Sequence, residues 1–128
     1  MNRIMREIAE ARLGALTVDD AGTLEGRFLF PERFAGFDGH FPEHPILPAM
    51  VEIMTVVSLL GEHAGCRQRL AAVEEAKFLV PVRPCQEILV RCRPRTVKGK
   101  LLYDARLTVG DATSATLLIE LAGSGGLP

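Results

Sequence analysis

The chain has 128 residues, a length typical of one domain, and 48% of them are hydrophobic, which is enough to build a core. Its net charge of −1 argues against a protein that binds nucleic acid or a membrane through its overall charge. The three cysteines have neither metal-binding nor disulfide spacing, so we expect free thiols in the cytoplasm and no metal or other cofactor.

Three elements are expected before the first long loop. The charged, amphipathic start of the chain predicts a helix over residues 2–11 and lacks the apolar core of a signal peptide. Strands are expected over residues 13–18 and 23–31, separated by the turn signal Asp-Asp-Ala-Gly. The second strand carries Phe28 and Phe30 on one face, because side chains two positions apart in a strand share a face.

The loop over residues 33–48 contains the segment Gly39–Pro48, which reads GHFPEHPILP. Its three prolines fix their own φ angles and keep the preceding residues out of the helical region, so we expect an extended, stiff loop. A stiff loop that brings His40 and His44 to the start of a helix favours a reactive site over a plain connection. A metal site made of Asp38 and the two histidines is disfavoured, because no fourth ligand is nearby.

The one strong helix is expected over residues 49–63. Its polar positions fall within an arc of about 120°, and the rest of its surface is apolar. A helix of this kind is expected to be enclosed on several sides, most simply by a curved sheet. The apolar run over residues 46–60 is interrupted by an acidic residue and is too short to span a bilayer. The polar positions are Glu52, Thr55, Ser58 and Glu62.

The rest of the chain predicts strands, in which apolar residues occupy every second position as in antiparallel sheets with one buried face. Gly110 and Asp111 form a hairpin turn between the last two. The order of elements predicts a single α+β domain over residues 1–128. In this domain an antiparallel sheet wraps around one central apolar helix, which is the hotdog fold. The expected strands cover residues 70–79, 86–94, 101–109 and 113–121.

The loop and the helix start resemble the signature GHFPxHPIMPG of the hotdog-fold 3-hydroxyacyl-[acyl-carrier-protein] dehydratases. Eight positions agree at fixed spacing, Leu47 is a conservative replacement, and Ala49 takes the place of the final glycine. A second segment, KFLVPVRPCQE, resembles the family's F-x-x-P-V-x-P-G-D, with Cys85 and Gln86 in place of the Gly-Asp pair. The resemblance covers about residues 23–122.

The resemblance implies a homodimer that acts on acyl chains attached to acyl carrier protein. As general base, His40 removes the proton from C2 of a β-hydroxyacyl thioester, because an imidazole titrates near neutral pH. The backbone N–H of Ala49 donates to the thioester carbonyl at the helix N-terminus, where developing negative charge is stabilised. The residues implied for the loop and the acyl tunnel are Phe41, His44, Pro48 and Ser58, of which His44 is expected to be structural.

The acidic partner of the family's histidine is missing. In the family an acid fourteen positions after the histidine, supplied by the other subunit, handles the departing hydroxyl, but here that position is Met54. Met54 is expected to form part of the core or to widen the apolar channel. Glu52 lies about 200° around the helix from that position, so we expect a polar-stripe or dimer-contact residue. The loop acid Glu43 is expected to be solvated.

Basic residues are concentrated in the second half of the chain. Between Lys77 and Arg106 there are eight Lys and Arg residues against two acidic ones. Arg91 and Arg93 are therefore candidates for docking the acidic carrier protein, and an ordinary solvated sheet face is the alternative.

Three functions remain open from the sequence. The first is a dehydratase of β-hydroxyacyl thioesters in fatty-acid or related acyl-chain biosynthesis, with His40 as base and without the usual acid. The second is a weak or inactive acyl-binding subunit, which includes a hotdog chain paired with a different hotdog subunit. The third is a hotdog thioesterase, which ranks last because it needs a carboxylate near the helix start.

Overall fold

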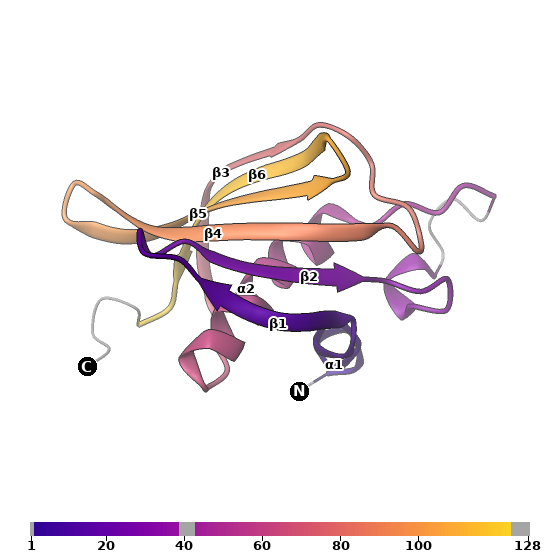
Figure 1. Ribbon diagram of the computed structural model, residues 1–128, viewed down its shortest axis with the longest axis horizontal. Coiled ribbons are helices and arrows are strands. Elements are labelled where there is room, and N and C mark those ends of the chain that lie inside the picture. The colour runs from indigo at the N-terminus through magenta and orange to yellow at the C-terminus, as the bar shows by residue number, and fades with distance from the viewer. Residues whose placement is uncertain (1, 39–42, 124–128) are drawn as a thin grey trace.

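The computed structural model describes residues 2–38 and 43–123 of the chain. Its main element is a curved six-stranded sheet with the strand order β1-β2-β4-β5-β6-β3 (Figure 1). All neighbouring strands are antiparallel, and β3 lies at the edge opposite to β1. The strands are β1 (Arg12–Val18), β2 (Leu24–Leu29), β3 (Leu70–Phe78), β4 (Glu87–Val97), β5 (Lys100–Val109) and β6 (Ala112–Leu121).

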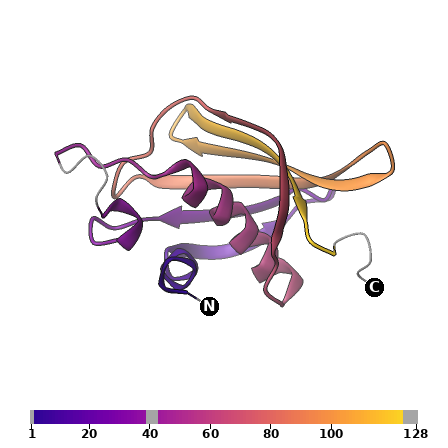
Figure 2. The ribbon, with the colours of Figure 1, turned by 180° about the vertical axis from the view of Figure 1, so that it is seen from behind.

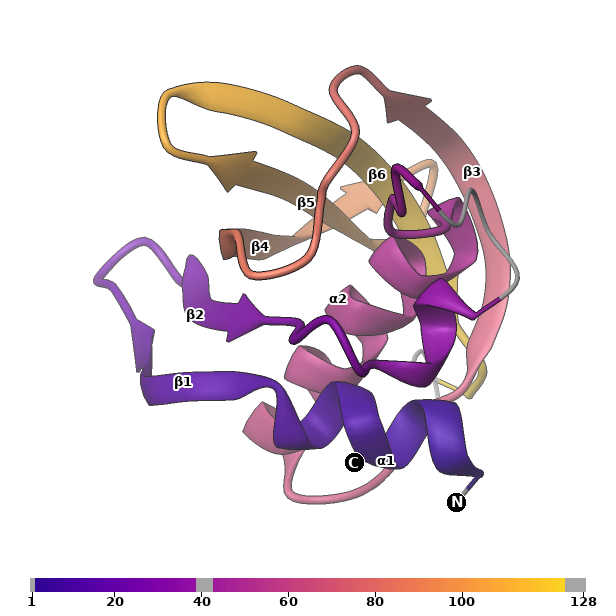
Figure 3. The same ribbon diagram turned by 90° about the vertical axis from the view of Figure 1, so that its right-hand side faces the viewer.

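The long helix α2 (Ala49–Ala64) lies in the hollow of the sheet (Figures 2 and 3). Its apolar side chains and the inward side chains of the strands form one core, in which Val56, Leu59, Phe28 and Ile119 have 0% exposure. Each side chain of this size contributes about 1.5–3 kcal/mol when it is fully buried. The prediction of an α+β hotdog fold, with an antiparallel sheet around a central apolar helix, is therefore confirmed.

A short helix, α1 (Arg3–Glu10), packs beside α2 (Figure 3). Its N-cap is Asn2, whose side chain accepts a hydrogen bond from the Met5 N–H at 2.8 Å. The helix also holds a 3-10 turn, η1 (Ala35–Phe37), whose first N–H donates to the Glu7 carboxylate at 2.9 Å. The loop expected over residues 33–48 thus begins with a short turn that is tied to the N-terminal helix.

The strand β4 is longer than the sequence predicts. It continues to Val97 and pairs with β5 along its whole extension, although it contains Pro94. A proline inside a run normally marks the end of a strand, which is why the prediction stopped at residue 94. The extension ends in a tight turn at Lys98 and Gly99, both of which have positive φ angles, as hairpin turns require.

Half of the polar arc predicted for α2 is buried, whereas Glu62 is exposed and Ser58 is half-buried. Glu52 and Thr55 are buried, with 4% and 0% exposure, and Thr55 Oγ1 donates to the Val51 carbonyl at 2.7 Å. A hydroxyl that bonds to the carbonyl four residues earlier needs no water, so it fits inside a core. The first turn instead exposes Ala49 and Met50, the latter at 57%.

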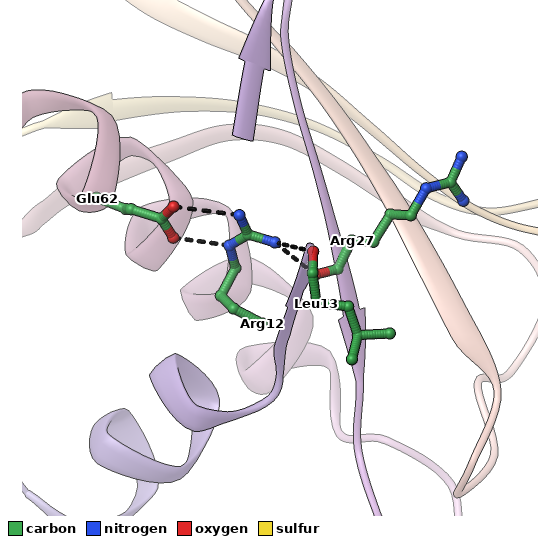
Figure 4. Close-up of polar contacts among 4 residues, drawn as sticks. All are labelled: Arg12, Leu13, Arg27 and Glu62. Atoms are coloured by element: carbon green, nitrogen blue, oxygen red, sulfur yellow. Dashed lines mark hydrogen bonds and ion pairs between the residues drawn. The ribbon is translucent and has the colours of Figure 1, made fainter. Parts of the chain in front are cut away.

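Arg12 of β1 fastens the C-terminal half of α2 to the sheet (Figure 4). Its guanidinium forms a two-pronged ion pair with Glu62, with Nε–Oε1 at 2.7 Å and Nη2–Oε2 at 3.1 Å. Its Nη1 donates to the carbonyls of Leu13 and Arg27, each at 2.8 Å. The side chain of Arg12 is only 10% exposed, and its guanidinium lies 5.4 Å from the centre of the Phe28 ring. This planar fork uses the geometry that makes arginine suited to paired contacts.

Candidate functional site at the start of helix α2

The first turn of α2 begins at Ala49, the position whose N–H the family resemblance assigns to a carbonyl oxygen. Pro48 is the N-cap, with φ −62° and ψ 148°, so the chain enters the helix from an extended conformation. The first N–H groups of a helix have no partner within the helix. Among residues 2–38 and 43–123, no backbone carbonyl outside the helices and strands accepts the Ala49 N–H, and Ala49 is exposed. The donor that the sequence analysis assigned to position 49 is therefore available.

The chain before α2 is attached to the loop that precedes β4. The Leu47 N–H donates to the Val82 carbonyl at 2.7 Å, and the Cys85 N–H donates to the Phe30 carbonyl at 2.8 Å. Cys85 has a φ of +66°, in the left-handed region that favours glycine. This is the position where the dehydratase motif has glycine. The backbone at this position thus has a conformation that favours glycine, although the residue is a cysteine.

The two loop histidines, His40 and His44, add little to the part of the site that the structure describes. His40 and Phe41 lie outside the residues that the structure describes. His44 is exposed, and its predicted hydrogen bond within the loop stays a prediction, because residues 39–42 of that loop lie outside the described part of the chain. Glu43 is exposed, which confirms that it is solvated.

Met54 and Ser58 are both half-buried on α2. Met54 packs against the hydrophobic core, as the sequence predicted for one of its two readings. Ser58 lines a groove of about 360 Å³ between α1, α2 and the segment that follows α2, and Met54 and Ala49 are not among the residues that line this groove. The structure therefore does not bring Ser58 and the helix start into one described cavity.

Glu52 faces the sheet, and its predicted position in a polar stripe or a dimer contact was wrong. Its Oε1 lies 3.3 Å from Ser114 Oγ on β6, and the residue is only 4% exposed. Burial raises the pKa of the Glu52 carboxyl to about 7, although the Ser114 hydroxyl opposes this shift. Ser114 could not be predicted from the sequence, because its inward orientation depends on an irregularity of β6 that the pattern of alternation does not contain.

Arg91 and Arg93 lie on the outer face of the sheet, the face away from α2. They line a hollow of about 230 Å³ together with Arg106 and Asp104. Arg91 Nε forms an ion pair with Glu25 Oε2 at 2.9 Å, and Arg91 stands directly opposite Arg106 in the sheet. The cluster is therefore basic, but it is not adjacent to the first turn of α2.

The described residues show neither a cluster of metal ligands nor a membrane-spanning helix. In the described ranges, no three His, Cys, Asp or Glu side chains are grouped as metal ligands. Of the helices in those ranges, none combines the length and apolar character that crossing a bilayer requires.

The sequence comparisons point to dehydratases. Residues 17–116 match the family model of ApeI-like proteins, described as ApeI dehydratase. The chain is 36% identical over 85 residues to the 3-hydroxyacyl-[acyl-carrier-protein] dehydratase FabZ of Fusobacterium nucleatum, covering 62% of this chain and 60% of that protein. It is 33% identical over 105 residues to the FabZ of Acidiphilium cryptum, covering 70% of this chain and 64% of that protein. The chain thus spans less than two thirds of the length of these curated relatives.

Solved structures share the fold. The dehydratase heterocomplex ApeI:P of Xenorhabdus doucetiae matches with a TM-score of 0.69 and 20% identity, over 86% of this chain and 95% of that one. The PaaI protein of the phenylacetic acid degradation operon of E. coli matches with a TM-score of 0.60 and 14% identity, over 83% of this chain and 79% of that one. At these identities the two matches support the hotdog architecture alone.

Proposed function

Because the chain belongs to the ApeI-like dehydratase family, within the wider group of FabZ-like hotdog proteins, we propose that it is a hydro-lyase acting on β-hydroxyacyl thioesters. The observation that carries this proposal is the exposed first turn of α2, where the Ala49 N–H is available to a carbonyl oxygen. The proposed substrate is an acyl chain on the phosphopantetheine arm of acyl carrier protein, in fatty-acid or related acyl-chain biosynthesis. The free cysteines support a cytoplasmic location.

The proposed chemistry is removal of water across C2 and C3. His40 takes the C2 proton, and the enolate-like oxygen that develops is held by the Ala49 N–H. The hydroxyl at C3 leaves as the double bond forms, and it needs a proton. Met54 has no proton to give, so water supplies it in this proposal. A dehydratase that lacks one member of its catalytic pair is expected to be slow rather than inactive.

The reverse reaction offers the simplest test of this proposal. Purified protein is mixed with a short trans-2-enoyl thioester, and the loss of the conjugated thioester is followed by absorbance. Hydration that disappears in His40→Ala, but persists in His44→Ala, would support the assignment of the base. Turnover that is equal in wild type and His40→Ala would contradict it.

A second candidate function is that of an acyl-binding partner subunit. The half-buried, apolar Met54 at the position of the family's acid favours it. In this case a different hotdog chain supplies the acid. No hydration by the isolated protein, together with hydration by a mixture with such a chain, would identify it. A thioesterase would need the carboxylate of Glu43 or Glu52 near the helix start. Glu52 faces β6, so this alternative loses one of its two candidates.

We propose that the chain pairs through the edge strand β3, in a homodimer with one continuous sheet. Most of β3 is exposed, and Val73, Phe78, Leu79 and Val80 are exposed apolar residues along it and just after it. An unpaired, apolar strand edge is normally covered in a native protein. In an antiparallel pair centred on Ala76, Glu75 of one subunit stands opposite Lys77 of the partner subunit on the outer face.

Exchanging the charges at positions 75 and 77 tests this pairing. Lys77→Glu places like charges opposite each other twice per dimer, so we expect its dissociation constant to rise by roughly tenfold. Glu75→Lys should have the same effect, and the double variant Glu75→Lys/Lys77→Glu should restore the wild-type value. Sedimentation equilibrium measures all four proteins. A double variant no tighter than the single ones would exclude this register.

We further propose that Arg91 and Arg93 dock the acidic carrier protein. Since these arginines lie on the outer face, the acyl arm must pass around the end of the sheet to reach α2. Arg93→Glu should weaken carrier binding, and the loss should shrink at high salt. Arg93 is the sharper choice, because reversal at Arg91 also breaks its pair with Glu25. Unchanged binding would remove this surface from the proposal.

A further inference from the structure

Ser114 lies in a β-bulge that turns its side chain into the core. Leu107 pairs with Ala115 and Thr108 pairs with Thr113, so Ser114 is the extra residue on β6. A bulge re-aims a side chain that would otherwise follow the alternation of its strand. As a result Ser114 is only 1% exposed and faces Glu52 on α2.

The Ser114 hydroxyl has two neighbours that both accept hydrogen bonds. Its Oγ lies 3.3 Å from Glu52 Oε1 and 3.3 Å from the Leu107 carbonyl oxygen. A hydroxyl has one hydrogen, so it cannot make a full hydrogen bond to both oxygens. If Glu52 carries a proton, its O–H donates to Ser114 Oγ and the Ser114 O–H donates to Leu107. Only the neutral acid satisfies the whole chain of contacts.

The same bulge holds the segment that follows β3. The Ser114 carbonyl accepts hydrogen bonds from the Leu79 N–H at 2.8 Å and the Val80 N–H at 3.3 Å. Ser114 therefore connects three parts of the molecule: the first half of α2, the strand β5, and the exposed apolar segment after β3. Only one residue, Ser114, therefore separates Glu52 from this segment.

We propose that Glu52 is a buried proton-binding site that locks α2 to β6 in its neutral form and loosens the chain after β3 when it ionises. The proposal holds whether or not the chain is a dehydratase. It agrees with the raised pKa of Glu52, for which burial is the larger cause. The charged groups of the surrounding elements point elsewhere or pair with one another. They are Glu75 and Lys77 on the outer face of β3, Asp104 and Arg106 on the outer face of β5, Glu120 of β6, which pairs with Lys100, and Glu62 of α2, which pairs with Arg12.

The sign of the pH effect follows from the direction of the shift. The pKa of Glu52 rises from 4.5 to about 7 on folding, so the folded protein binds this proton more tightly than the unfolded chain. The contribution of Glu52 to the free energy of unfolding is fully present below pH 4.5. It is lost as the pH rises from there through about 7. Glu52→Gln keeps the shape and the neutrality at every pH, and it removes this dependence.

The test compares wild type with Glu52→Gln in urea titrations between pH 5 and 8 at one protein concentration. The folding equilibrium constant of wild type should fall by roughly 50- to 100-fold relative to Glu52→Gln over this range. Glu10→Gln, at an exposed position of α1, is the matched control and should follow wild type. Equal pH slopes in wild type and Glu52→Gln would overturn the proposal.

Two further measurements separate a proton lock from a general loss of stability. The carboxyl ¹³C resonance of Glu52, assigned by its absence in Glu52→Gln, should titrate near neutral pH, and titration in the ordinary range of glutamate would overturn the proposal. Hydrogen-exchange protection of the Leu79 and Val80 amides should fall between pH 6 and 8.5 in wild type, after correction for intrinsic exchange. It should remain in Glu52→Gln. An equal fall in both proteins would show that the link through Ser114 does not respond to Glu52.

Discussion

The two ends of α2 are built in opposite ways. The C-terminal end is closed: Gly65 caps it in the left-handed conformation, its N–H donates to the Gly61 carbonyl at 2.9 Å, and Glu62 is held by Arg12. The N-terminal end is open: Pro48 provides no side-chain cap, and Ala49 and Met50 are exposed. A helix that is fixed at one end and open at the other can present free N–H groups to a ligand without losing its position in the core.

The largest effect is expected from removing the donor at the open end. A proline fits the first helical position, and Pro48 already has the extended conformation that a following proline demands. Ala49→Pro should therefore fold normally but lose the N–H proposed to hold the thioester oxygen. We expect enoyl hydration to fall by about 10²–10³-fold, the cost of one such donor in other enzymes.

Ala49→Gly is the matched control, because it keeps the N–H and restores the glycine of the dehydratase motif. It should retain activity at or above the wild-type rate. If Ala49→Pro hydrates the substrate as fast as Ala49→Gly, the carbonyl is held elsewhere and the open end has another purpose.

Arg12→Ala removes the ion pair that holds the C-terminal end of α2. The change removes the fork to Glu62 and leaves the carbonyls of Leu13 and Arg27 without this donor. We expect the free energy of unfolding to fall by about 2–3 kcal/mol in urea titrations, with little change in activity per folded molecule. Arg3→Ala breaks an ion pair of α1 whose arginine is 64% exposed, and it should cost much less than Arg12→Ala. Similar losses in the two variants would mean that Arg12 is not a special anchor.

The smallest effect is expected at Cys85, in the loop to which the chain before α2 is attached. Cys85 holds a φ of +66°, which costs a residue with a Cβ more than it costs glycine. Cys85→Gly should raise the midpoint of thermal unfolding, with a gain of about 1 kcal/mol at most, since glycine also loses more entropy on folding. Cys66→Gly, at an exposed position without this constraint, should not stabilise the protein. A lower midpoint for Cys85→Gly would mean that its side chain matters more than its backbone.

The sequence predicted those features that depend on local patterns. Alternation along β5 predicts that Tyr103, Ala105 and Leu107 share one face, which is the core face, and Pro48 marks the start of α2. The missing acid at Met54, which only the family resemblance implies, stays a prediction. Contacts between distant residues did not follow in this way. Arg12 and Glu62 are fifty positions apart, and the bulge that turns Ser114 toward Glu52 leaves no trace in the alternation of β6.

The exposed edge of β3 makes the aggregation of this protein depend on how many of its chains are unpaired. A lone chain presents free backbone donors and acceptors next to Phe78, Leu79 and Val80, which are 44%, 58% and 44% exposed. Such a surface adds strands of any chain that offers a similar edge. Association with the correct partner lowers the concentration of unpaired chains by mass action. Since unpaired chains are the templates for aggregation, association protects the protein from it. If a different hotdog chain is the partner, production of this chain in excess over that partner is expected to send it into inclusion bodies.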